Sequence, residues 1–232
     1  QHLPTKASAD ALTAVLTACG VDDAAQITAW QTAAARIRRA AGRRTATTVV
    51  PYRGLAPFGE EDAPWFFGRD DLTTELLTRV RAATTGTGPQ VTLVIGPSGS
   101  GKSSLLRAGL AASAATDPTF TTWPTAVVTP AGLGVAALTE ALTAPGPAVL
   151  VVDQFEELWT HCSPDDRAAV FTALATIGPG IVVVIGLRAD FYPAAAREPV
   201  LVPILAAGPL VVGPLTDTDL FFNDAAPAEK AG

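Results

Sequence analysis

The sequence contains no methionine, and it is poor in cysteine, histidine and charged residues. Its two cysteines, Cys19 and Cys162, are too few for a disulfide framework, so we expect both to serve packing. The two histidines, His2 and His161, have no ligand-like spacing to either cysteine, which excludes a zinc site of these residue types. Because the chain also begins with Gln1, we expect it to be part of a longer protein.

Long apolar runs are missing as well. The longest, residues 200–215, is interrupted by Pro203, Pro209 and Pro214 and falls short of the ~20 residues that a membrane helix needs. We therefore expect no membrane segment, and we find no signal peptide. The 232 residues are 48% hydrophobic, which is enough for one sizeable domain with an appendage.

Charge is distributed unevenly along the chain. Residues 1–50 hold six basic and three acidic side chains, a balance of +3, and since the whole chain carries −6, the remainder carries −9. The negative net charge of residues 51–232 argues against a nucleic-acid-binding surface in this main part of the chain. The basic run from Arg36 to Arg44 leaves two interpretations open: a solvated linker, or part of a DNA-binding unit.

Residues 1–44 predict a small helical hairpin. Apolar residues recur at helical spacing over residues 8–19, and Asp22 or Asp23 can cap a second helix. The segment Leu3 to Val21 resembles the end of the helix-turn-helix domains of actinobacterial regulators, which makes DNA a candidate partner of this region. Residues 45–53 are interpreted as a linker.

The most informative feature of the sequence is a glycine-rich motif between a strand and a helix. Residues 91–95 are apolar and β-branched, residues 96–103 fit G-x-x-x-x-G-K-[ST], and residues 104–110 can start a helix. This order is typical of a phosphate-binding loop, and a glycine-rich surface turn is the alternative. The residues that we assign to nucleotide binding here are Gly96, Pro97, Ser98, Gly99, Ser100, Gly101, Lys102, Ser103 and Ser104.

The loop chemistry follows from its residue types. Glycines at 96, 99 and 101 allow positive φ angles, so that backbone N–H groups can surround phosphate oxygens together with the start of the helix. Lys102 is expected to reach the β- and γ-phosphates, and Ser103 to place its hydroxyl on Mg²⁺.

An acidic segment follows another apolar strand. Residues 148–152 form a continuous apolar run that ends in Asp153, the pattern of a Walker B strand whose carboxylate holds Mg²⁺ opposite Ser103. Downstream, Glu156 or Glu157 can orient or deprotonate the attacking water, or both can be solvated residues of a helical first turn.

A fourth strand, residues 181–185, is followed by Arg188. If this strand lies beside the phosphate-loop strand, Arg188 faces the γ-phosphate and can distinguish ATP from ADP. The alternative is a structural ion pair of Arg188 with Asp190 or Asp153.

An aromatic stretch, residues 51–72, precedes the phosphate-loop strand. We expect Asp70 to cap a helix that runs to Ala83. The loop that ends in Phe67, Gly68 and Arg69 can form a lid for a nucleotide base, or it can merely anchor the helix.

The remaining segments complete an α/β pattern. Strands are predicted at residues 125–129 and 210–212, and helices at 132–142 and from Ser163 to the break at Gly178.

Together these motifs resemble the STAND NTPases, signalling ATPases related to AAA+ proteins, and specifically the bacterial novel STAND class. The similar segments are G-L-A-P-F-G-E-E-D-A-P-W-F-F-G-R (54–69), G-P-S-G-S-G-K-S-S-L-L-R-A-G-L (96–110), V-L-V-V-D-Q-F-E-E-L-W (149–159), G-L-R-A-D-F-Y (186–192) and G-P-L-T (213–216). The resemblance implies a three-layer αβα P-loop NTPase domain over residues 54–216, with a parallel sheet of order 5-1-4-3-2. It also implies a nucleotide contact by Pro214 and the start of a helical arm at residues 217–232.

The resemblance further implies a sensor domain after this chain and an effector or DNA-binding domain before it. Our leading hypothesis is a cytoplasmic switch that binds ATP or ADP with Mg²⁺, hydrolyses ATP slowly and forms a homo-oligomer in the ATP state. We identify no arginine finger, in line with slow hydrolysis. The alternatives are a DNA-binding transcription regulator gated by the ATPase and a P-loop small-molecule kinase.

Overall fold

The computed structural model describes residues 23, 24, 28 and 56–214. The chain divides into two compact units, Gln1–Val50 and Pro51–Gly232, and the fold described below belongs to the second. The predicted linker at 45–53 and helical arm at 217–232 lie outside the described residues, as does nearly all of the predicted hairpin at 1–44.

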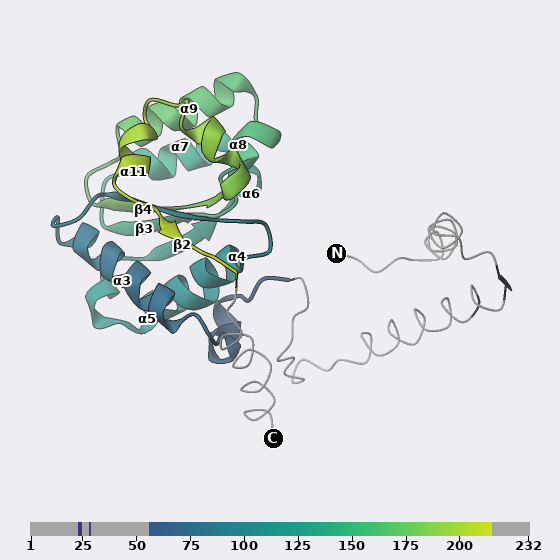
Figure 1. Cartoon of the computed structure of the whole chain (residues 1–232). Helices are drawn as coiled ribbons and strands as arrows, with labels where there is room; N and C mark the ends of the chain where they lie inside the picture. The colour runs from purple at the N-terminus through teal and green to yellow at the C-terminus, as the bar shows by residue number, and fades with distance from the viewer. Residues whose placement is uncertain (1–22, 25–27, 29–55, 215–232) are drawn as a thin grey trace. The chain divides into compact units, whose positions relative to one another are not determined.

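The centre of the second unit is a five-stranded parallel sheet (Figure 1). Its strands are β1 (Val91–Gly96), β2 (Thr125–Val128), β3 (Ala148–Val152), β4 (Ile181–Arg188) and β5 (Leu210–Val211). They lie in the order β2-β3-β4-β1-β5, which read from the β5 edge is the 5-1-4-3-2 order that the family resemblance implies. The predicted α/β class and parallel sheet are therefore confirmed.

The strand sequences are continuously apolar because both faces of the sheet are covered. In β4, Ile181, Val183 and Ile185 belong to one buried cluster, whereas Val182 and Val184 belong to the other. Successive side chains of a strand point to opposite faces, so a central strand such as β4 contributes to two cores at once.

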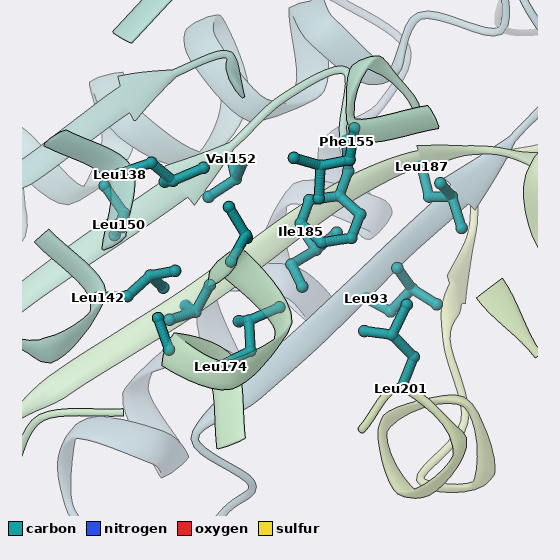
Figure 2. Packing of buried hydrophobic residues seen from close by; sticks show 14 of the residues in the cluster. Leu93, Leu138, Leu142, Leu150, Val152, Phe155, Leu174, Ile185, Leu187 and Leu201 are labelled. Atoms are coloured by element: carbon teal, nitrogen blue, oxygen red, sulfur yellow. The ribbon is translucent and has the colours of Figure 1, made fainter. Parts of the chain in front are cut away.

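One face is covered by α7 (Val135–Thr143), α9 (Pro164–Ala175) and α11 (Val202–Ala206), with the shorter helices α6 (Pro130–Leu133), α8 (Glu157–Thr160) and α10 (Tyr192–Ala195). Figure 2 shows Leu138 and Leu142 of α7 and Leu174 of α9 beside Leu150 and Ile185 of the sheet. Burying each such side chain contributes about 1.5–3 kcal/mol relative to leaving it exposed.

The opposite face carries α3 (Asp70–Thr84) and the helical stretch that follows the glycine-rich loop: α4 (Lys102–Ser104), the π-helical η2 (Leu105–Ala111) and α5 (Ala112–Thr116). Three short 3-10 turns complete the unit: η1 (Glu60–Trp65), η3 (Pro118–Phe120) and η4 (Ala189–Phe191). Helices thus lie on both sides of the sheet, which is the predicted three-layer arrangement.

Two local predictions are wrong. Asp70 does not cap α3: the capping position is Arg69, without a side-chain bond, and Asp70 is the first helical residue. The helix predicted at 132–142 is two helices, because Gly134 has a left-handed φ of 86° and Thr129 caps α6 by accepting from the Gly132 N–H.

The carboxyl ends of the parallel strands meet at one edge of the sheet, which is where ligands bind in open α/β folds. Gly96 of β1 is in register with Arg188 of β4, and Asp153 follows directly on β3. The residues predicted to handle phosphate, metal and water are therefore brought to the same edge. Among the helices at residues 56–214, none is long and apolar enough to cross a membrane.

Candidate nucleotide-binding site

The glycine-rich loop joins β1 to α4. Gly99 and Gly101 have φ angles of 78° and 88°, values that residues with a side chain rarely adopt, so these glycines allow the loop to turn as predicted. Gly96 differs from the prediction, because its φ is not positive. It is required by close approach instead: a Cβ there would lie 2.3 Å from the carbonyl oxygen of Val212, which follows β5.

Lys102 lies within the loop rather than out in solvent. Its side chain is 9% exposed, and Nζ donates hydrogen bonds of 2.8 Å to the carbonyl oxygens of Gly96 and Pro97. Burial lowers the pKa of Lys102, while the charges of Glu156 and Asp153 act in the opposite direction. The ammonium group is thus held at the loop in a position from which it can neutralise a bound anion.

Oxygen ligands suited to a hard cation meet behind the loop. The Ser103 hydroxyl donates a 3.1 Å hydrogen bond to Oδ1 of Asp153, a residue that is 1% exposed. On the other side, Nη2 of Arg107 lies 3.4 Å from Oδ2 of the same carboxylate. A hydroxyl and a carboxylate are ligands that Mg²⁺ accepts in nucleotide sites, where substrate phosphates and water complete its shell. The donor set therefore fits Mg²⁺.

The two candidate glutamates point to different places. Glu156 is 9% exposed, lines the cavity described below, and accepts a 3.2 Å hydrogen bond at Oε2 from the backbone N–H of Arg188. Burial raises its pKa, although hydrogen bonds and the charge of Lys102 oppose the shift. Glu157 instead accepts a 2.8 Å bond from the N–H of Ala131 at the start of α6. The structure thus places only the first of the two beside the loop.

Arg188 is the last residue of β4, the strand that lies between β3 and β1 in the sheet. Its guanidinium forms a two-pronged pair with Asp190, with Nε–Oδ1 at 3.0 Å and Nη2–Oδ2 at 2.7 Å, and lies 5.8 Å from the ring centre of Phe191. This pairing matches the alternative in which Arg188 forms an ion pair with Asp190. Arg188 nevertheless lines the cavity, so it is also within the site.

The aromatic stretch closes the site from the other side. The N–H of Phe58 donates to the hydroxyl of Ser104 at 3.1 Å, and the rings of Phe58 and Phe66 lie 6.2 Å apart. Arg69 bridges two segments, donating from Nη2 to the carbonyl oxygens of Ser100 at 3.3 Å and Gly213 at 2.8 Å. The stretch is therefore attached to both the loop and the segment after β5.

These elements enclose a cavity of about 500 Å³. Its lining includes the predicted residues Phe67, Arg69, Ser98, Gly99, Ser100, Gly101, Lys102, Ser103, Ser104, Glu156 and Arg188. The predicted residues Gly68, Gly96, Pro97, Asp153, Glu157 and Pro214 do not line it. The cavity is also lined by five residues that the sequence analysis did not assign to the site: Ala56, Pro57, Phe58, Phe66 and Gln154. Apart from Gln154, these belong to the aromatic stretch, whose density of rings was the available signal.

An α/β sheet with a glycine-rich loop, a buried aspartate and a lysine at one edge is typical of nucleoside-triphosphatase domains. The chain belongs to the family described as Novel STAND NTPase 1, whose model matches residues 51–232. The comparison with curated proteins gives no significant match. The family suggests a signalling function of the NTPase type.

Proposed function

We propose that this chain is a nucleotide-dependent switch that binds ATP or ADP with Mg²⁺ in the 500 Å³ cavity and hydrolyses ATP slowly. The observation that carries the proposal is the convergence of Lys102, Glu156 and Arg188 on one cavity from three separate elements. Family membership supports the same class of chemistry.

The cavity has two chemically different ends. The loop end offers backbone N–H groups, the start of a helix and the ammonium of Lys102, all of which suit phosphate. The other end offers Phe58, Phe66 and Phe67, which suit a nucleotide base. A nucleoside triphosphate would therefore lie with its phosphates on the loop and its base against the aromatic stretch.

Ser103 and Asp153 would hold Mg²⁺, and the ion would supply positive charge next to a bound phosphate. Asp153 can serve this role because a buried carboxylate needs a cationic partner. In the structure, the hydroxyl of Ser103, the guanidinium of Arg107 and the backbone N–H of Gln154 are its partners.

Glu156 is the residue best placed to receive a proton from water. It is buried beside Lys102, its Oε2 is fixed by the Arg188 N–H, and its raised pKa makes it a stronger base than an ordinary glutamate. Arg188 would recognise the γ-phosphate after leaving Asp190, so the pair would report whether ATP or ADP is bound.

Several further features belong to the proposal alone. We propose domain limits at residues 1–44, 45–53, 54–216 and 217–232, a cytoplasmic location, a homo-oligomer in the ATP state, and sensor and effector domains outside this chain. DNA binding through the basic N-terminal region is the alternative output. Titration of the chain against DNA at several salt concentrations tests it, because specific binding must exceed the salt-sensitive background.

The experiment that tests the proposal measures phosphate release from ATP and from GTP, with Mg²⁺ and with a chelator. We expect slow, Mg²⁺-dependent release that Glu156→Gln reduces and the matched control Glu157→Gln leaves unchanged. Mass spectrometry of nucleotide retained through purification should find ADP or ATP. Absence of both retained nucleotide and release would refute the proposal.

A further inference from the structure

Gln154 has an unusual backbone. Its φ is 55°, and no other non-glycine residue in the described part of the chain has a positive φ. A left-handed backbone conformation is energetically unfavourable for glutamine. Residues in such conformations are found where surrounding contacts hold them in place, frequently at functional sites.

Hydrogen bonds hold this backbone from both sides. The N–H of Gln154 donates to Oδ1 of Asp153 at 2.9 Å, and its carbonyl oxygen accepts from the N–H of Glu157 at 2.9 Å. The next residue, Phe155, is 1% exposed and donates its N–H to the carbonyl oxygen of Gly186 on β4 at 2.9 Å. The turn is therefore built into the end of β3, and it is not a free loop.

The Gln154 side chain does not take part in this support. It is exposed and lines the cavity together with Glu156 and Arg188. Its carboxamide forms no hydrogen bond within residues 56–214, so both its donor and its acceptor are available to a ligand. A carboxamide can accept from one hydroxyl hydrogen of a water molecule while donating to a phosphate oxygen.

We propose that Gln154 is a catalytic residue that orients the attacking water for γ-phosphate hydrolysis, an inference that rests on the proposed function. In this step the water oxygen forms a bond to the γ-phosphorus. The bond from that phosphorus to the β,γ-bridging oxygen breaks, and its electron pair leaves with ADP. The water proton passes to the Glu156 carboxylate and then to the released phosphate. Gln154 neither gains nor loses a proton, so it complements the glutamate.

The strained turn explains why this position suits the task. Gln154 directly follows Asp153 and donates its N–H to the carboxylate proposed to hold the metal, and both Gln154 and Glu156 line the cavity. The Gln154 carboxamide, proposed to orient the water, and the Glu156 carboxylate, proposed to accept its proton, therefore line the same cavity.

The test uses two variants that both lose the carboxamide but differ in backbone strain. Gln154→Ala keeps a side chain at the left-handed position, whereas Gln154→Gly relieves the strain. Single-turnover hydrolysis of ATP with Mg²⁺ is measured together with ATP affinity and thermal unfolding. We expect both variants still to bind ATP and to hydrolyse bound ATP about 100-fold more slowly in a single turnover, the loss typical for one polar contact to a transition state.

Gln154→Asn serves as the conservative variant, since asparagine tolerates this backbone and keeps the carboxamide; it should recover part of the rate. A wild-type rate in folded Gln154→Gly would overturn the inference, because the side chain would then be dispensable. Failure of the wild-type chain to bind ATP would instead overturn the proposed function, so the two failures are distinguishable.

Discussion

The hydroxyl of Ser103 donates a 3.1 Å hydrogen bond to Oδ1 of Asp153, joining the phosphate loop to the end of β3 across 50 residues of sequence. This bond brings together the two side chains that the proposed function assigns to Mg²⁺. It also shows that the hydroxyl and the carboxylate lie within hydrogen-bonding distance of each other in the fold.

Asp153→Asn is expected to weaken the Mg²⁺ dependence of nucleotide binding. The substitution keeps the size of a buried side chain but removes its charge; because loss of a group that only supports a metal ligand already costs about 10- to 100-fold in metal affinity, loss of the ligand charge should cost at least as much. Calorimetric titrations of ATP at graded Mg²⁺ concentrations measure the effect. Asp165→Asn, at an exposed position in the first turn of α9, is the matched control and should behave as the wild type.

Gly96→Ala is expected to destabilise the fold. Its Cβ would lie 2.3 Å from the Val212 carbonyl oxygen and 2.8 Å from Oγ of Ser100, and such overpacking costs about 1–3 kcal/mol. Chemical denaturation followed by fluorescence gives the free energy of unfolding. Gly213→Ala is the control, because a Cβ there meets no atom within 4 Å. Equal stability of the two variants would show that β5 yields to the added methyl group.

The buried Glu156 should make stability depend on pH. Burial raises its pKa above 4.5, so the folded state holds the proton more tightly than the unfolded chain does. Its contribution is fully present below the unfolded pKa and is lost as pH rises through the folded pKa. Glu156→Gln should therefore raise the melting temperature at about pH 7 and change little at about pH 4. Thermal unfolding across this range, with Glu157→Gln for comparison, checks the sign.

Arg188→Ala is expected to weaken ATP binding about tenfold while leaving ADP binding nearly unchanged, because only ATP offers the γ-phosphate for a charge-assisted hydrogen bond. Competition titrations of both nucleotides measure the ratio. Arg197→Ala removes an exposed arginine that does not line the cavity and should preserve the preference for ATP. If Arg188→Ala also preserved it, Arg188 would be a structural partner of Asp190 alone.

Most of the fold could be predicted from the sequence because its strands are short, apolar and separated by clear breaks. Strand β1 ends at Gly96, and β3 ends directly before Asp153. The motifs at these two ends are defined by neighbouring residues in the sequence, so they could be recognised without knowing how distant segments pack. The strand order could not be obtained from such patterns. It came from the family resemblance, which the topology confirms.

The finer geometry of the site depends on three-dimensional detail that the sequence does not reveal. Glu156 and Glu157 are adjacent and of the same residue type, yet Glu156 lines the cavity whereas Glu157 accepts a hydrogen bond from Ala131 in α6. Similarly, the pairing of Arg188 with Asp190 is set by the turn at η4. Sequence patterns report which residues are present near a site, whereas backbone angles decide which of them face it.

Lys102 provides the most direct test of nucleotide binding at this site. Under the proposed function its buried ammonium group neutralises phosphate charge at the loop, so Lys102→Ala should weaken ATP binding at least about 30-fold, equivalent to about 2 kcal/mol. The measurement is a calorimetric titration of the wild type and the variant with ATP and Mg²⁺, after thermal unfolding has shown that both are folded. Saturable binding by the wild type that the variant loses is the expected result. Equal affinity of the two proteins would contradict a phosphate site at residues 96–103.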